Sequence, residues 1–243
     1  MYPTLDEVRK IAASGDYRRI PVSRELYADA FTPVEVLRTL RAASHHCYLL
    51  ESAEENQKWG RYSFLGYSPA MELTCRNGVL KIRTGEEDEL AAEETRTVSH
   101  PGETIREILA AYKSPKLPDM PPFTGGLVGY YSYRMIGYAE PTLKLSESDA
   151  DDFDLMLFHN VIAYDHLYQK ISILVNLETD NLLENYGAAC AELEKIIALI
   201  RDPMPLPRER ITDKPEFHCN VTKEQYCDIV NKTKQYLVDG DIF

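Results

Sequence analysis

Residues 70–84 constrain the fold of this chain most, because they have the pattern of an antiparallel β-hairpin. Apolar and polar residues alternate over residues 71–75 and again over residues 80–82, as expected of strands with one buried face. Asn77-Gly78 lies between the two runs, and this pair favours a two-residue turn because both positions tolerate a positive φ. The sequence therefore predicts an antiparallel sheet with a buried face.

Several helices are marked by capping signals. Thr4 and Thr32 are each followed three residues later by glutamate, which is the spacing of a capping box. Thr222 is followed by glutamine at the same spacing, and Gly240 is the expected end of that helix. We also predict an amphipathic helix over 104–112 and a long helix that is capped by Thr179 or Asp180 and runs to Arg201.

Two further runs are rich in strand-forming residues. Residues 154–165 and 169–177 read as the two arms of a second hairpin, joined by residues 166–168. The acidic residues at 86–89 and 93–94 read as one solvated loop. The predicted fold class is α+β, with antiparallel β-sheets in a sandwich-like arrangement flanked by helices.

A proline-rich segment divides the chain. Four prolines fall between positions 203 and 215, and no regular element is compatible with that spacing. We therefore predict a first domain over 1–201, a linker over 202–216 and the start of a second domain over 217–243. Because one helix cannot form a core by itself, the second domain is expected to be incomplete.

The charge balance excludes some classes of partner. The 243-residue chain has 27 Lys and Arg against 39 Asp and Glu, a net charge of −12, which argues against nucleic acid or an anionic membrane as a partner. No apolar run approaches the about 18–20 residues of a membrane span, and the first residues lack the apolar region of a signal peptide. We expect a cytoplasmic protein.

The end of one predicted strand carries a suggestive set of polar groups. The apolar pair Leu49-Leu50 leads directly into Glu51 and Ser52, and Arg61 follows within ten residues. A carboxylate suits an α-ammonium group and a guanidinium suits a carboxylate, so such a set can hold a zwitterion. Local chemistry alone favours the plainer alternative, a strand end with a solvated glutamate and a surface arginine.

Three motifs resemble one enzyme family in the same order along the chain. LLESAEENQKWGRYSFLGYSP (49–69), PPFTGGLVGYYSY (121–133) and TKEQYCDIVNKTKQYLVDGDIF (222–243) are similar to segments of the anthranilate synthase large subunit, a chorismate-using family of tryptophan synthesis. Two positions depart from the family pattern: Arg134 and His159 stand where aspartate is frequent. Neither lies in the LLES segment, so they bear on local packing and not on the resemblance itself.

The resemblance implies a regulatory site. In that family the LLES segment forms part of the tryptophan feedback site, so Glu51 and Ser52, with Leu50 beside them, are expected to contact the head group of L-tryptophan. Arg61 is expected to neutralise the carboxylate of the ligand. Lys58 is the alternative cation, although a solvated loop lysine is its plainer interpretation.

The resemblance also implies a parent reaction. The complete enzyme would be a lyase that converts chorismate and an amino donor to anthranilate and pyruvate, with ammonia supplied by a glutamine amidotransferase subunit. Magnesium would hold the chorismate carboxylate. Its ligands, the catalytic histidine and the second half of the tryptophan pocket are expected outside this chain. We therefore expect an N-terminal fragment, feedback-regulated and allosteric in its parent and inactive alone.

Three alternatives remain open at this stage. The aminodeoxychorismate synthase large subunit shares the fold and an amino-acid pocket, although the sequence of the 49–64 segment favours anthranilate synthase. A stand-alone tryptophan-binding module without a catalytic role is a second alternative. A structural remnant that binds nothing is the third.

No other motif predicts catalysis or a metal site. Gly125-Gly126 and Gly129 lack the spacing and the lysine of a phosphate loop, and close backbone packing is the expected role of these glycines. The six histidines show no catalytic spacing, and the pair His45-His46 reads as a surface pair. The five cysteines contain no C-x-x-C pair and are expected to be reduced.

Overall fold

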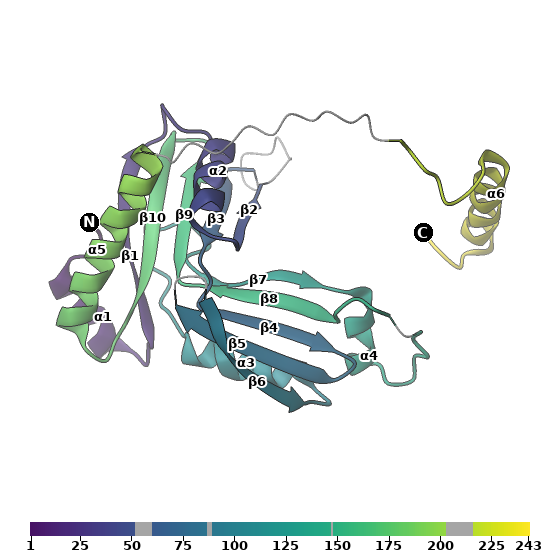
Figure 1. The fold of residues 1–243 in the computed structure, drawn as a ribbon, viewed down its shortest axis with the longest axis horizontal. Coiled ribbons are helices and arrows are strands. Elements are labelled where there is room, and N and C mark those ends of the chain that lie inside the picture. Colours follow the sequence, from purple (N-terminus) through teal and green to yellow (C-terminus); the bar gives the residue numbers. More distant parts are fainter. Residues whose placement is uncertain (52–59, 87–88, 147, 203–215) are drawn as a thin grey trace. The chain divides into compact units, whose positions relative to one another are not determined.

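The structure is a computed structural model that describes residues 1–51, 60–86, 89–146, 148–202 and 216–243. The chain separates into two compact units, Met1–Leu206 and Pro207–Phe243. The first unit holds two five-stranded sheets, and every strand pair in them is antiparallel. The predicted α+β class with antiparallel sheets and flanking helices is therefore confirmed (Figure 1).

We call the first sheet sheet A. Its strand order is β1-β10-β9-β3-β2, with bounds Arg19–Tyr27, Lys170–Glu178, Asn160–Asp165, Tyr62–Tyr67 and Cys47–Leu50. Three helices pack on one face of this sheet: α1 (Leu5–Ser14), α2 (Pro33–Ala43) and α5 (Leu182–Arg201). Their apolar side chains and those of the strands form the largest buried cluster, so burial of apolar surface holds this layer together.

The other sheet, sheet B, has the order β6-β5-β4-β8-β7. The bounds are Glu89–Thr97, Val79–Glu86, Met71–Arg76, Phe153–Phe158 and Gly126–Tyr131. Helix α3 (Pro101–Ala111) covers one face, where its Ile105 and Ile108 pack against the β4–β5 hairpin. A 3-10 turn, η1 (Tyr133–Met135), and the short helix α4 (Ile136–Ala139) follow β7.

The second unit contributes one described helix, α6 (Lys223–Asp239). Thr222 and Gln225 form the predicted capping box, and Gly240 ends the helix with a φ of 79°. Glycine suits that position because the left-handed conformation costs it nothing. The capping boxes predicted at Thr4 and Thr32 are also present.

The predicted β4–β5 hairpin is confirmed in detail. Asn77 and Gly78 have φ values of 50° and 77°, as a two-residue turn of this kind requires. Leu73 pairs with Ile82, and Cys75 pairs with Leu80, all four on the buried face.

Three sequence predictions were wrong. The run 154–165 is not one strand: it breaks at His159, so that β8 belongs to sheet B and β9 to sheet A. The acidic segment around 93–94 is strand β6 and not part of a loop, because Lys81 on β5 pairs with Glu93 across the sheet at 3.7 Å. The N-cap of α5 is Asn181, whose backbone N–H donates to the Asp180 side chain at 2.9 Å.

His159, at the break between β8 and β9, lines a small cavity of about 80 Å³. The His159 ring lies 5.3 Å from the Tyr112 ring, and its Nε2 is a buried atom without a hydrogen-bond partner among the described residues. Burial, assisted by the positive charge of Arg19, lowers the pKa of His159 from 6.5 to about 4. This histidine is therefore neutral at physiological pH.

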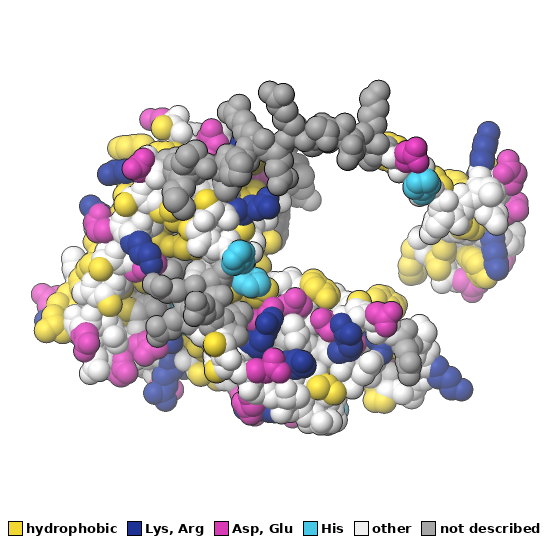
Figure 2. All heavy atoms as spheres, in the orientation of Figure 1, with side chains coloured by type: hydrophobic (Ala, Val, Ile, Leu, Met, Phe, Trp, Pro, Cys, Tyr) yellow, Lys and Arg dark blue, Asp and Glu magenta, His cyan; other side chains and the backbone are white. Residues whose placement is uncertain are grey.

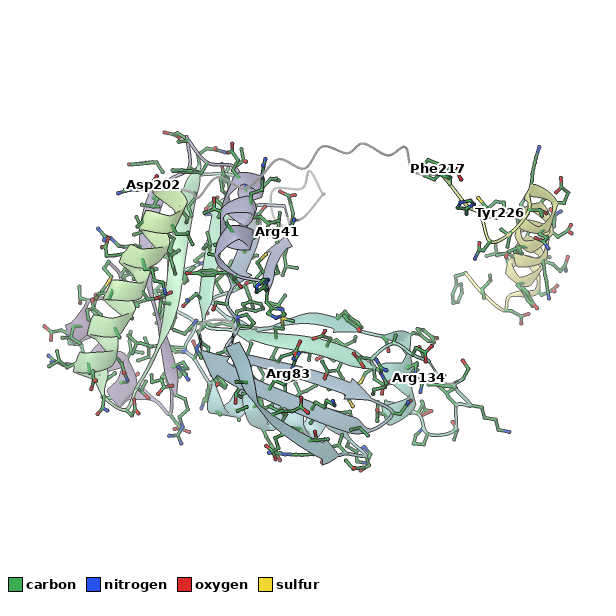
Figure 3. The ribbon with its side chains drawn as sticks, viewed as in Figure 1. Arg41, Arg83, Arg134, Asp202, Phe217 and Tyr226 are labelled. Atoms are coloured by element: carbon green, nitrogen blue, oxygen red, sulfur yellow. The ribbon has the colours of Figure 1, made fainter. Side chains whose placement is uncertain are left out.

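Arg134 belongs to a buried polar network at one end of sheet B (Figure 3). The Asp152 carboxylate, in a residue only 1% exposed, accepts hydrogen bonds from Arg134 Nε at 3.2 Å, Tyr138 Oη at 2.7 Å and the Asn77 backbone N–H at 2.8 Å. The network ties the β4–β5 turn to the segment after β7. The Asp152 carboxylate thus compensates the charge of Arg134.

The Asp152 network predicts a large effect of one substitution. Asp152→Ala should destabilise the protein by about 3–5 kcal/mol, because it removes the buried acceptor that Arg134 Nε, Tyr138 Oη and the Asn77 backbone N–H share. Asp149 is exposed, and Asp149→Ala is the matched control, expected within about 0.5 kcal/mol of the parent. Urea unfolding measures both, and equal effects of the two substitutions would contradict this account.

His159 predicts a pH dependence of stability. Its pKa is lower in the folded chain than in the unfolded chain, so the unfolded state binds more protons as the pH falls from 6.5 to about 4. The free energy of unfolding should therefore decrease over this window, by up to about 3 kcal/mol from this residue. His159→Gln should flatten that part of the profile, and His100→Gln, at an exposed histidine, should not.

Candidate functional site

The end of β2 brings Glu51 next to a buried serine. Strand β2 pairs with β3 so that Leu49 lies opposite Leu65 and Leu50 opposite Phe64. The same register carries Glu51 towards Ser63, whose Oγ lies 3.5 Å from Glu51 Oε1. Ser63 is fully buried, whereas Glu51 is exposed. The end of β2 thus presents a carboxylate to solvent, and β3 places a buried hydroxyl next to it.

His166 extends this group of polar side chains. Its Nε2 lies 2.7 Å from Ser63 Oγ, and its ring lies 4.7 Å from the ring of Tyr164, a neighbour in the same strand–turn segment. The backbone N–H of His166 donates to the Arg61 carbonyl at 2.9 Å, which fixes the turn after β9 against the start of β3. We call Glu51, Ser63 and His166 the β2-end cluster.

The other residues of the LLES segment are placed only in part. The Leu50 side chain is 47% exposed and points to the opposite face of sheet A from Glu51, because successive side chains of a strand alternate. Ser52 and the alternative cation Lys58 lie outside the described residues. Their roles stay predictions.

Arg61 is engaged by a buried carboxylate. Its guanidinium donates to Asp165 from Nε at 3.1 Å to both oxygens and from Nη2 at 2.6 Å. The rings of Tyr62 and Tyr168 each lie 4.8 Å from the guanidinium carbon. Burial opposes ionisation of Asp165, but the hydrogen bonds from Arg61 and from the Tyr168 and Leu167 backbone outweigh it and lower the pKa of this carboxyl.

Arg61 and Glu51 face opposite sides of sheet A. Arg61 lines a cavity of about 500 Å³ together with Tyr62, Asp165 and Lys170, on the face that α1, α2 and α5 do not cover. Glu51 contacts Ser63, which shares the helix-covered face with Leu65. The two residues expected to hold one zwitterion are therefore not brought together, and Arg61 would have to leave Asp165 to bind another carboxylate.

A second polar surface lies on sheet B, on the face opposite α3. Figure 2 shows side chains of both charges side by side there, and Figure 3 places Arg83 in their midst. They line a groove of about 660 Å³ and include Arg76, Lys81, Glu93 and Asp154. Arg83 pairs with Glu72, a residue 4% exposed, and burial raises the pKa of Asp154. Because the signs alternate, the groove selects no single ligand charge.

The glycine-rich segment has the packing role expected of it. Gly125 has a φ of 145°, and a Cβ there would lie 2.6 Å from Asn176 Nδ2. A Cβ on Gly129 would overlap the carbonyl oxygen of Asp154 in the neighbouring strand. These glycines permit close backbone approach, as predicted.

The described part of the chain contains no evident metal-binding site. No group of three or more His, Cys, Asp or Glu side chains in it is arranged to hold one, so no magnesium ligand is assigned among these residues. None of the five cysteines, all of which lie in the described ranges, forms a disulfide, and Cys75 is the buried one. No described helix combines the length and the apolar character needed to cross a membrane.

Sequence reasoning missed two members of the β2-end cluster. Ser63 lies within the quoted GRYSF motif, and His166 lies in the predicted turn, but neither was given a role. The signal was present: a serine at an inward-facing position of a strand needs a hydrogen-bond partner. What the sequence alone does not provide is the pairing of β3 with β9, which brings residues 63 and 166 together.

Comparison with known proteins gives a consistent result. The model of the chorismate binding enzyme family matches residues 79–243. Anthranilate synthase component 1 of Acetivibrio thermocellus is 35% identical over 100% of this chain and 49% of its own length. The same component from Pseudomonas aeruginosa (strain ATCC 15692) is 33% identical over 97% of this chain and 48% of its own length. The chain therefore spans about half the length of these curated relatives.

A solved structure shows the same fold. The crystal structure of anthranilate synthase component I from Streptococcus pneumoniae TIGR4 superimposes with a TM-score of 0.53 at 23% identity, over 90% of this chain and 46% of that chain. The resemblance to anthranilate synthase component I read from the three motifs is thus confirmed. With more than half of its residues matched by the family model, the chain belongs to the chorismate binding enzyme family.

Proposed function

We propose that this chain supplies the N-terminal regulatory part of an anthranilate synthase component I and carries part of an L-tryptophan feedback site. The alignment with component 1 relatives, which covers 97–100% of this chain and about half of each relative, supports the enzyme assignment. The observation that carries the regulatory role is the Glu51 carboxylate, which is exposed at the end of β2 and backed by Ser63.

The ligand chemistry follows from that carboxylate. An exposed carboxylate that is held by a hydroxyl can receive the α-ammonium of an amino acid through a charge-assisted hydrogen bond. Ser52, the next residue, supplies a second polar group for the head group. Leu50 lies at the same strand end and is 47% exposed, but its side chain is on the opposite face of sheet A from Glu51.

The parent reaction joins chorismate and an amino donor, glutamine or ammonia, to give anthranilate and pyruvate for tryptophan biosynthesis. In this proposal a glutamine amidotransferase subunit delivers the ammonia, magnesium binds outside the described residues, and the enzyme works in the cytoplasm. Tryptophan inhibits by binding more tightly to a state that is less competent for chorismate. No catalytic residue is assigned to this chain.

The alternative enzyme is aminodeoxychorismate synthase component I. The relatives reported above are all anthranilate synthase component 1, which favours the first assignment. A product assay separates the two when the chain is part of an active enzyme, since anthranilate is fluorescent and the rival makes none. A tryptophan-binding module without a catalytic role is the remaining alternative.

Tryptophan should stabilise the chain. At about 100 times its dissociation constant, a ligand adds about 2.7 kcal/mol to the free energy of unfolding, which raises the melting temperature by about 5–10 °C for a unit of this size. A thermal melt with L-tryptophan measures this, with L-leucine as the matched control. Identical melting curves with and without L-tryptophan would defeat the proposed site.

Ligand analogues separate the roles of Glu51 and Arg61. Glu51→Ala should weaken L-tryptophan binding about tenfold or more and leave indole-3-propionate, which lacks the ammonium, unaffected. Arg61→Ala should lower stability, because it leaves Asp165 buried without its partner. Calorimetric titration and urea unfolding measure the two effects. If Arg61→Ala weakened L-tryptophan but not tryptamine, which lacks the carboxylate, Arg61 would be the carboxylate ligand after all.

A further inference from the structure

The hydrogens of the β2-end cluster can be arranged in two ways. Ser63 Oγ lies between His166 Nε2 at 2.7 Å and Glu51 Oε1 at 3.5 Å. A serine hydroxyl carries one hydrogen, so it can donate to the histidine or to the glutamate but not to both. The tautomer of His166 determines whether the Ser63 hydroxyl donates to His166 or to Glu51.

One arrangement gives both Ser63 Oγ and the Glu51 carboxylate a hydrogen-bond donor. If His166 carries its hydrogen on Nε2, it donates to Ser63 Oγ, and the Ser63 hydroxyl then donates to the Glu51 carboxylate. In the other tautomer, Ser63 donates to Nε2 and the carboxylate loses this donor. The first arrangement is favoured because it adds a charge-assisted hydrogen bond at the carboxylate.

The surroundings hold the histidine in place for this role. The Tyr164 ring lies 4.7 Å from the His166 ring, and Gln169 Nε2 donates to the His166 carbonyl at 2.8 Å. The adjacent carboxylate, Asp165, is paired with Arg61 on the other face of sheet A. Ser63 is 0% exposed, so it has no access to a substrate and serves as a relay, not as a nucleophile.

We propose that His166 and Ser63 are positioning residues for Glu51: a hydrogen-bond relay from His166 Nε2 through Ser63 Oγ orients the Glu51 carboxylate for a ligand's ammonium group. The identity of that ligand as L-tryptophan rests on the proposed function. The relay itself does not, because it exists in the free chain.

The relay is tested by the tautomer of His166 in the 243-residue chain. Nitrogen-15 NMR of the imidazoles at about pH 8, where an ordinary imidazole is neutral, should show His166 with its hydrogen on Nε2. In Glu51→Ala the hydroxyl is released from the carboxylate and can donate to Nε2, so the tautomer should shift towards Nδ1–H. His100, an exposed histidine, is the internal control and should not change.

A double-mutant cycle excludes an indirect effect. In the Ser63→Ala background, Glu51→Ala should leave the His166 tautomer unchanged, because the connection is gone. A shift of the same size with and without Ser63, or no shift in Glu51→Ala itself, would overturn the relay. Thermal melts check that each variant is folded.

Ligand binding provides the second readout. His166→Gln keeps an N–H donor and should retain L-tryptophan affinity, whereas His166→Phe should lose about tenfold and keep its affinity for indole-3-propionate. Equal affinity for L-tryptophan in both variants would refute the positioning role. If the parent chain failed to bind L-tryptophan, the proposed function would fail, and the tautomer measurement would still decide the relay.

Discussion

The pairing of β3 with β2 on one side and β9 on the other determines where the described members of the β2-end cluster lie. This register brings Glu51 from the end of β2, Ser63 from β3 and His166 from the turn after β9 into one cluster. A shift by one residue would turn Ser63 to the other face and expose Leu65, which is fully buried. The cost of exposing Leu65 therefore protects the geometry of the cluster.

The two faces of sheet A differ in how their carboxylates are compensated. The Asp165 side chain is 9% exposed, and its carboxylate accepts hydrogen bonds from Arg61 and two backbone N–H groups, so the arginine stabilises the turn after β9. Removing one partner of a buried ion pair lowers the stability strongly, because the other charge stays buried without compensation. The intact pair itself adds little stability compared with apolar residues in the same place. Glu51, in contrast, is exposed. The exposed carboxylate is available to a ligand, and the buried pair maintains the strand ends that present it.

Much of the fold could be predicted from local signals. Capping boxes at Thr4, Thr32 and Thr222 and the Asn77-Gly78 turn depend on neighbouring residues, and the structure confirms them. The break at His159 could not be predicted, because the residues on both sides of it favour strands. The boundary follows only from the assignment of β8 and β9 to separate sheets. Strand β6 was not predicted because its glutamates suggest a solvated loop. In the structure Glu93 pairs with Lys81 on β5, and Glu94 pairs with Arg96 of the same strand.

The candidate site was predicted in part. The LLES segment drew attention to Glu51, but its partners Ser63 and His166 depend on strand pairing between residues about a hundred positions apart. Arg61 was chosen for its proximity in sequence. Alternation would put residue 61 on the face of Ser63, but Arg61 lies just before β3 and its ion pair with Asp165 holds it on the other face of the sheet. Spacing in the sequence thus identified the strand end but not the side chains that surround it.

Hydrogen exchange with L-tryptophan tests the central claim most directly, that the end of β2 forms part of a tryptophan site. The account predicts slower amide exchange in Cys47–Leu50, at Glu51 and around Ser63, with no change in the β4–β5 hairpin of sheet B. Unchanged exchange at the end of β2, or protection confined to another part of the chain, would contradict it.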